Sequence, residues 1–204
     1  MSTGTIAALV ALGFGVMLVR RRSFATWLLT AQSLLLGIAA LTLADEGSGL
    51  LVAGVILVVR AVALPALLAL TRRRTPEPSP VAPATTVVVR LLVATVVCLV
   101  AVASVPPLGL GDAAAEHGAV ALLCLGIAIV IMRRPALVQV LGILVAENGV
   151  YLLAVSVQGG LPFAIELGVL VDLALVVTVA AAFAQKIHGE VGSGDTDLLR
   201  GLRD

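Results

Sequence analysis

Three carboxylates lie within two long apolar segments of the C-terminal half of the chain. Glu147 belongs to residues 136–157, and Glu166 and Asp172 belong to residues 162–185. A charged carboxylate in the hydrocarbon core of a bilayer is costly, and acids found there typically serve ion or proton pathways or pair with another charge. These three acids are therefore candidates for stations of a proton path, or for buried partners of a cation.

Glu147 and Asp172 are expected at the same depth in the membrane. The two segments form a hairpin that turns at Gly159 and Gly160, and each acid lies 12 residues from the nearer of these glycines. At 1.5 Å per residue, both acids lie about 18 Å from the turn. If they face each other, they can exchange a proton through a water molecule. Glu166 lies roughly 9 Å deep and on another face of its helix.

Other polar residues accompany these acids. Asn148 is adjacent to Glu147, and Tyr151, one helical turn further on, can place a hydroxyl near the carboxylate. In the N-terminal part, Arg60 and Gln32 are expected at a common depth on two successive helices. Because arginine stays protonated, Arg60 can set the field felt by a carboxylate or pair with one, but it cannot relay protons by titrating.

The composition places the chain among polytopic membrane proteins. It has 204 residues, 60% of them hydrophobic, and a strongly positive mean hydropathy. This excludes a soluble domain built around one core, and a net charge of +1 gives no indication of nucleic-acid binding. No phosphate loop, haem ligand pair, flavin motif, quinone site, hydrolytic triad or metal-ligand spacing is present, so we expect no cofactor in this chain.

About 20 apolar residues are needed to cross the hydrocarbon core. The sequence predicts an all-α protein with about seven transmembrane helices, over residues 4–19, 24–44, 49–70, 87–105, 117–132, 136–157 and 162–185. We expect a three-helix part over 1–70, a proline-rich cytoplasmic linker over 71–86, a four-helix part over 87–187 with a hairpin at 136–185, and a polar cytoplasmic tail over 188–204.

The basic residues indicate the orientation. Clusters of arginine or lysine follow the first, third, fifth and seventh segments. The opposite loops contain no lysine or arginine, but they do contain the acids Asp45, Glu46, Asp112 and Glu116. By the positive-inside rule, the N-terminus lies outside and the C-terminus in the cytoplasm. The arginines follow the first segment rather than precede it, so we interpret that segment as a retained helix and not a cleaved leader.

Five sequence stretches resemble one known family in the same order. They are AQSLLLG (31–37), LVVRAVALPALLAL (57–70), QVLGILVAENGVYLLA (139–154), ELGVLVDLALVV (166–177) and AQKI (184–187). Together they resemble the E component of the hydrogenase 4 and formate hydrogenlyase family. The last helices are also similar to the K-type subunit of respiratory complex I and to the C-type subunit of multisubunit cation/proton antiporters.

The resemblance implies a membrane-arm subunit of an energy-converting hydrogenase-type complex in the cell (inner) membrane of a prokaryote. Its partners would be antiporter-like membrane subunits, a redox-proximal membrane subunit, lipid and a peripheral cytoplasmic arm. NiFe or other redox metal centres and iron–sulfur clusters would belong to those partner subunits. The chain itself would catalyse no reaction, but would serve a redox-driven, ion-translocating oxidoreductase.

The resemblance also implies roles for particular residues. Glu147 matches the first intramembrane glutamate of the related complex I subunit, and Asp172 stands in the place of the second. Glu166 belongs to the family's own pattern. Arg60 is a departure, since relatives tend to have lysine there.

Two other functions stay open. The chain could be a scaffold that joins antiporter-like and redox-proximal subunits, with its acids paired and silent. It could also be a self-contained transporter, although the sequence contains no inverted repeat or paired broken helices of the kind that build transporter sites.

Overall fold

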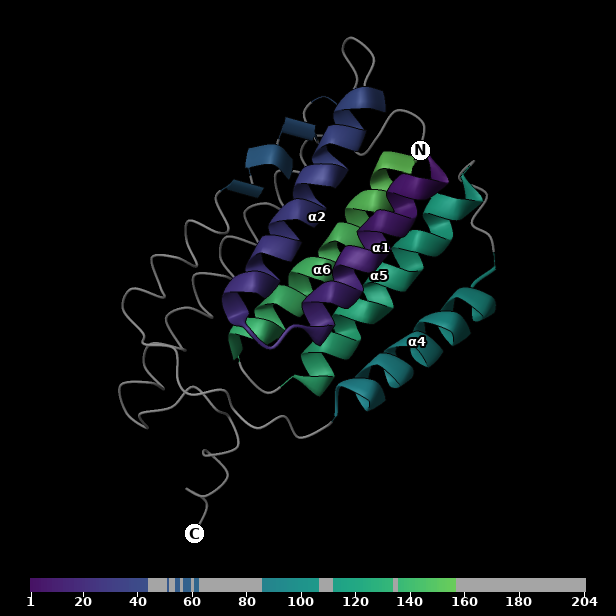
Figure 1. Cartoon of the computed structure of the whole chain (residues 1–204). Helices are drawn as coiled ribbons and strands as arrows, with labels where there is room; N and C mark the ends of the chain where they lie inside the picture. The colour runs from purple at the N-terminus through teal and green to yellow at the C-terminus, as the bar shows by residue number, and fades with distance from the viewer. Residues whose placement is uncertain are drawn as a thin grey trace.

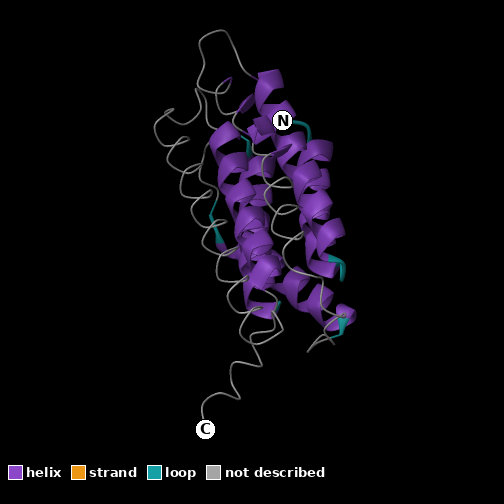
Figure 2. Cartoon of the chain, turned by 90° about the vertical axis from the view of Figure 1, so that its left-hand side faces the viewer, coloured by secondary structure: helices purple, strands orange, loops and turns teal. Residues whose placement is uncertain are grey.

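The computed structural model describes residues 1–43, 51, 54–55, 57–59, 61–62, 86–106, 112–133 and 136–156. Five helices lie in this part of the chain: α1 (Thr3–Leu18), α2 (Arg22–Leu43), α4 (Val87–Ser104), α5 (Ala113–Met132) and α6 (Ala136–Ser156). Figures 1 and 2 show these helices running roughly side by side as one bundle. The described residues thus confirm an all-helical architecture.

The five helices correspond to five of the seven predicted segments. Within the third segment, 49–70, the described residues are helical. The seventh segment, 162–185, and the tail lie outside the described residues. So does the linker up to residue 85. The count of seven helices therefore stays a prediction.

The predicted start of the fifth helix was wrong by four residues. Helix α5 begins at Ala113 rather than at residue 117, because the Asp112 side chain caps it by accepting a hydrogen bond of 3.1 Å from the Ala115 N–H. Glu116, expected in an outer loop, lies in the first turn of α5 and is buried. The three consecutive alanines after Asp112 also favour this additional helical turn, since alanine has the strongest helix propensity.

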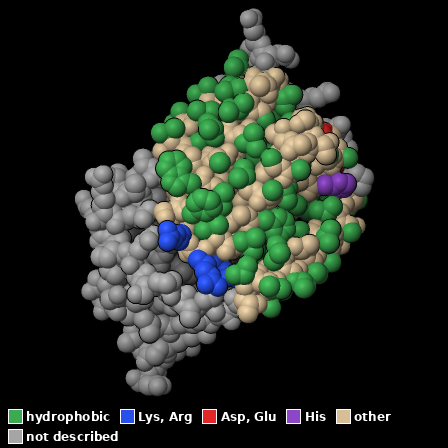
Figure 3. All heavy atoms as spheres, in the orientation of Figure 1, with side chains coloured by type: hydrophobic (Ala, Val, Ile, Leu, Met, Phe, Trp, Pro, Cys, Tyr) green, Lys and Arg blue, Asp and Glu red, His purple; other side chains and the backbone are tan. Residues whose placement is uncertain are grey.

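Four of the described helices are long and apolar enough to cross a membrane: Ser23–Leu43, Val87–Ser104, Ala113–Met132 and Val138–Val155. Helix α1 is apolar but shorter. Many large hydrophobic side chains of these helices are exposed, and they cover much of the face shown in Figure 3. Such a surface suits lipid or partner helices, and the chain is a multi-pass membrane protein.

Helices α5 and α6 form the closest pair in the bundle. A Cβ atom on Gly126 of α5 would lie 2.5 Å from both the Ala146 nitrogen and the Gly142 carbonyl oxygen of α6. One turn of α6 beyond Ala146, a Cβ on Gly149 would lie 2.8 Å from the Ala119 carbonyl oxygen. The backbones approach this closely only because the crossing residues are small.

The bundle has a basic end, which we define by Arg20, Arg21, Arg90 and Arg133. The Arg133 guanidinium, just after α5, donates from Nη2 to the Val19 carbonyl at 2.9 Å and from Nη1 to the Met17 carbonyl at 3.4 Å. This places the C-terminal ends of α1 and α5 at the same level. A cation at a helix C-terminus also opposes the negative end of the helix dipole. Figure 3 shows Lys and Arg side chains grouped at one end of the visible face.

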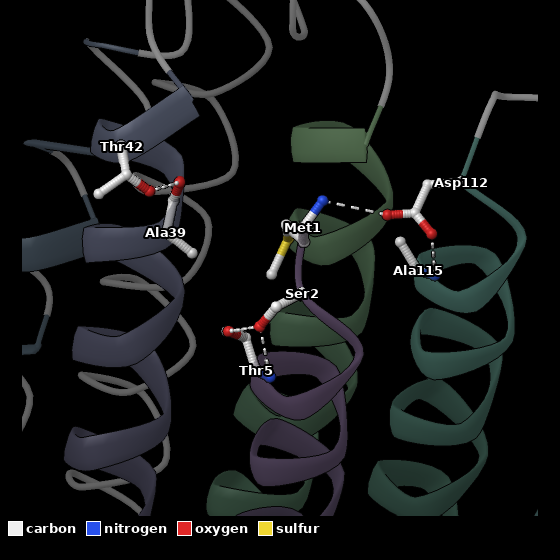
Figure 4. Close-up of polar contacts among 7 residues, drawn as sticks. All are labelled: Met1, Ser2, Thr5, Ala39, Thr42, Asp112 and Ala115. Carbon is white, nitrogen blue, oxygen red and sulfur yellow. Dashed lines mark hydrogen bonds and ion pairs between the residues drawn. The ribbon is translucent and has the colours of Figure 1, made fainter.

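Asp112 marks the opposite end. Its Oδ2 lies 3.2 Å from the Met1 ammonium nitrogen, so the start of α1 adjoins the start of α5 (Figure 4). The described arginines and this acid are thus separated along the bundle, as the predicted topology requires. Which end faces the cytoplasm stays a prediction.

The cap at Asp112 should respond to pH. The Ala115 N–H, followed by the Met1 ammonium, lowers the pKa of the Asp112 carboxyl below its ordinary value of 3.8. A depressed pKa in the folded state stabilises the protein above the unfolded value, and this contribution is lost as the pH falls through the folded value. Hydrogen exchange at the start of α5 should therefore increase below about pH 3.8 in the native protein, relative to Asp112→Asn, whose cap does not titrate. Parallel pH profiles for the two proteins would contradict this assignment.

Candidate functional site

A buried polar cluster joins α1, α2 and α6. Asn148 of α6 donates from Nδ2 to Gln32 Oε1 at 3.0 Å and lies within hydrogen-bond distance of Ser33 Oγ. Gln32 in turn donates from Nε2 to the Leu9 carbonyl oxygen of α1 at 2.9 Å. The Gln32, Ser33 and Asn148 side chains are all fully buried. We call these three residues the amide cluster.

Glycine makes room for the amide cluster. A Cβ on Gly13 would lie 3.3 Å from Gln32 Nε2 and 2.8 Å from a methyl of Leu125. Gly13 therefore lets the Gln32 amide reach the backbone of α1 between apolar neighbours. The carbonyl of Leu9 lies four residues before Gly13, so Gln32 binds the turn of α1 that directly precedes this glycine.

Glu147 lies beside the amide cluster, near the middle of α6. It is 11 residues from the start of the helix and nine from its end, which is about 17 Å from the basic end of α6. Its side chain has intermediate exposure, and its Oε1 atom is buried. A carboxylate therefore does lie at mid-helix in a segment long enough to span the bilayer.

The helical spacing sets the direction in which Glu147 points. Ile143 and Val150, four residues before and three after it, are both exposed, whereas Gly142 and Gly149 face α5. Residues at i−4 and i+3 share a face, so Glu147 lies on the outward stripe and away from α5. Asn148 is turned by about 100° from it, toward α2. The carboxylate thus leaves α6 on a different side from the amide cluster, and its Oε1 atom is buried there.

Tyr151 is buried one turn after Glu147. The side chain exposes 3% of its surface, and the hydroxyl oxygen is buried. The spacing of four residues places it on the adjoining face of α6, and the predicted approach of its hydroxyl to the Glu147 carboxylate stays a prediction. This stretch of α6 thus carries a carboxylate, an amide and a phenol within five residues, supplied by Glu147, Asn148 and Tyr151.

The remaining predicted site residues are not placed by the structure. Arg60, Glu166 and Asp172 lie outside the described residues. The expected proximity of Glu147 to Asp172, and of Gln32 to Arg60, therefore stays a prediction. Among the described residues, no group of three or more His, Cys, Asp or Glu side chains is arranged to hold a metal ion.

Sequence reasoning missed the contact between Gln32 and Asn148. The sequence placed Gln32 at the depth of Arg60 and noted Asn148 as the neighbour of Glu147, but it proposed no contact between the two amides, which the structure joins across α2 and α6. A usable signal was present, because each is a neutral polar residue inside an apolar helix, and a buried amide needs a partner. The sequence does not show which helices are neighbours, so the pairing could not be assigned.

The amide cluster should contribute measurably to stability. In Asn148→Leu, the Gln32 carbonyl oxygen loses its donor and stays buried, which costs about 1–3 kcal/mol. We expect the double variant Gln32→Leu/Asn148→Leu to lose less than the sum of the two single variants, since neither amide is then left alone. Thermal unfolding of all four proteins in one detergent measures the coupling. Strictly additive losses would show that the two amides do not interact.

Part of the chain is similar to a known family. Residues 114–204 match the family model described as NADH-ubiquinone/plastoquinone oxidoreductase chain 4L, a region that includes nearly all of α5 and the whole of α6. An uncharacterized protein of Mycobacterium tuberculosis is 30% identical over 90 residues, which is 44% of this chain and 41% of that relative. This chain therefore covers less than half of that relative's length. No solved structure matches.

The family match supports the coarser part of the sequence interpretation. It shows that the C-terminal region, where Glu147 lies, resembles a membrane subunit of complex I. The narrower resemblance to hydrogenase 4 component E stays a prediction.

Proposed function

We propose that this chain is a membrane subunit of a complex I-like, ion-translocating assembly and that Glu147 carries protons through it. The observation that bears most weight is the position of this carboxylate. It lies at mid-helix on α6, next in sequence to Asn148 of the buried amide cluster, within the region that matches the chain 4L family. An acid held at such a depth is typically part of an ion or proton pathway.

The chemistry required of Glu147 is simple proton exchange. A carboxyl group can take up a proton from one side and release it to the other, provided that a second acid or a water chain lies within reach. Asp172 and Glu166 are our proposed further stations, and Arg60 would supply a fixed positive charge. Asn148, Gln32 and Tyr151 would hold the local geometry rather than carry the proton, because amides and a tyrosine hydroxyl do not readily titrate near neutral pH.

Within the complex I-like group, we favour the hydrogenase 4 and formate hydrogenlyase type. The support is the set of sequence stretches from AQSLLLG (31–37) to AQKI (184–187), which extends well before the family match at residue 114. In this proposal the chain sits in a prokaryotic cell membrane, between antiporter-like subunits and the redox-proximal membrane subunit. The NiFe and iron–sulfur centres belong to its partners.

A scaffold role is the alternative. Its support is the number of exposed hydrophobic side chains, on α2 and α4 above all, which offer wide surfaces to neighbouring subunits. A scaffold would need its acids only for packing or pairing. It would therefore tolerate neutral replacements of Glu147 and Asp172 without any change in ion movement.

The proposal is tested by isolating the chain with its partners. A tag on the full chain, extraction in a mild detergent and mass spectrometry should recover antiporter-like and redox-proximal membrane subunits together with a redox arm. Membrane vesicles from cells that lack this chain should lose redox-driven proton movement. A stable chain that is recovered alone and moves ions by itself would contradict the proposal and indicate a self-contained transporter.

A further inference from the structure

Arg90 is a buried cation near the start of α4. It is the fourth residue of that helix and exposes 1% of its surface. Its Nε and Nη2 atoms are buried, and neither has a hydrogen-bond partner among the residues that the structure describes. Arginine does not lose its charge under physiological conditions, so burial without an acceptor is strongly unfavourable.

The described charged residues at the same end of the bundle as Arg90 are arginines, so they do not neutralise its charge. Arg20, at the turn between α1 and α2, is close enough for its charge to act on Arg90. Arg133 lies at the same end, but its guanidinium already donates to the Met17 and Val19 carbonyls. Asp112 lies at the opposite end of the bundle. Within the described part of the chain, Arg90 therefore has a nearby cation but no hydrogen-bonding anion.

The first turn of α4 favours an anion at the same place. Thr86 caps the helix and accepts a hydrogen bond of 3.3 Å from the Val89 N–H. The N–H groups of Val87 and Val88 have no carbonyl partner within the helix, because the residues four positions before them lie outside α4. The positive end of the helix dipole lies at the same place. An arginine side chain on a helix leans toward the N-terminus, which is the end of α4 that carries these N–H groups.

The rest of this side of α4 is apolar: Ala94 and Cys98, four and eight residues after Arg90, are buried against the bundle, and the valines at its edge are exposed. Val93, Val97 and Val100 follow Arg90 at intervals of three, four and three residues, which places them along the exposed edge of that side. All three are exposed, in a helix long enough to span the bilayer. An anion that fits here has a charged group at the helix start and an apolar body along the helix.

We propose that the basic end of α4 binds the phosphate of an anionic phospholipid. Arg90 is the principal ligand and Arg20 adds attraction, while the acyl chains lie along Val93, Val97 and Val100. The level of the site agrees with this occupant, because Arg90 lies in the first turn of a spanning helix, where headgroup phosphates are found. A phosphate supplies acceptors that the buried guanidinium does not find among the described residues.

The test uses the full chain in the assembly with which it purifies, placed in phosphatidylcholine nanodiscs that contain a small fraction of spin-labelled phosphatidylglycerol. Electron paramagnetic resonance measures the motionally restricted fraction of the label. We expect the wild type to restrict the label and Arg90→Gln to lower its relative affinity by about tenfold or more. Arg21→Gln, which removes an exposed arginine at the same end, should leave it within about twofold.

Further arms of this experiment identify the ligand. Arg90→Lys keeps a charge but loses the planar set of donors, so we expect an intermediate affinity, and this variant serves if Arg90→Gln does not fold. Displacement of the label by inorganic phosphate would assign the site to a free anion and overturn the lipid proposal. Equal restriction by wild type and Arg90→Gln would overturn it as well. No restriction by the wild type would overturn the lipid proposal too.

Discussion

Glu147→Gln is expected to abolish redox-driven proton movement while the complex still assembles. The variant keeps the size of the side chain and its capacity for hydrogen bonds, but it removes the group that takes up and releases a proton. We expect translocation to fall by about 10²-fold or more, the range over which a positioned acid–base group acts. Proton uptake or release by membrane vesicles, driven by the redox substrate of the complex, measures the effect.

A matched control lies on the same helix. Gln139 of α6 donates to the Val130 carbonyl of α5 at 3.3 Å and lies two turns before Glu147. Gln139→Leu removes a polar side chain without touching the amide cluster or the carboxylate, and it should translocate at nearly the wild-type rate. Redox activity of the partner subunits, assayed without a proton gradient, must survive in both variants. Full pumping by Glu147→Gln would remove Glu147 from the path.

Gly126→Leu is expected to cause the largest loss of stability. The added Cβ atom would overlap the backbone of α6 at Ala146 and Gly142, and the crossing cannot open without separating the two helices. Overpacking costs about 1–3 kcal/mol even where side chains can adjust, and here the obstacle is backbone. We expect failed assembly, or a clear drop in the thermal midpoint of the protein that is recovered. Size-exclusion profiles and thermal unfolding in detergent measure both.

Alanine substitutions at two glycines provide the control for this seam. Gly126→Ala places a methyl group against the α6 backbone, whereas Gly15→Ala places one 3.0 Å from the tip of the flexible Leu28 side chain. Alanine also favours a helix over glycine by roughly 1 kcal/mol. Gly15→Ala should therefore be neutral or stabilising, and Gly126→Ala destabilising. Similar stabilities for the two variants would show that α5 and α6 are not closely packed at Gly126.

The helices could be predicted from the sequence because a helix that crosses the bilayer needs a minimum number of consecutive apolar residues. Runs of apolar residues predicted α1, α2, α4, α5 and α6 to within a few residues at most boundaries. The exception, the start of α5, depended on a cap by Asp112 and on the buried first-turn acid Glu116. Neither follows from hydropathy, which ranks both residues simply as polar and assigns them to a loop.

The contacts between helices were less accessible, for a physical reason. Apolar helices in lipid carry little pattern that distinguishes one face from another, since lipid is as apolar as the protein interior. The sequence therefore selected Gln32, Asn148 and Tyr151 as polar residues of interest, but it could not pair Gln32 with Asn148. From the sequence, Arg133 was only a member of the basic cluster after the fifth segment. The structure shows that its guanidinium binds carbonyls at the end of α1.

The central claim is that Glu147 changes its protonation state during turnover, and infrared difference spectroscopy tests it most directly. The complex is cycled between its reduced and oxidised states, and the carbonyl stretch of protonated carboxylic acids is followed in wild type and Glu147→Gln. The account predicts a band, shifted in deuterium oxide, that is present in the wild type and missing in the variant. Identical difference spectra, with turnover intact in both proteins, would show that Glu147 does not exchange a proton and would contradict the account.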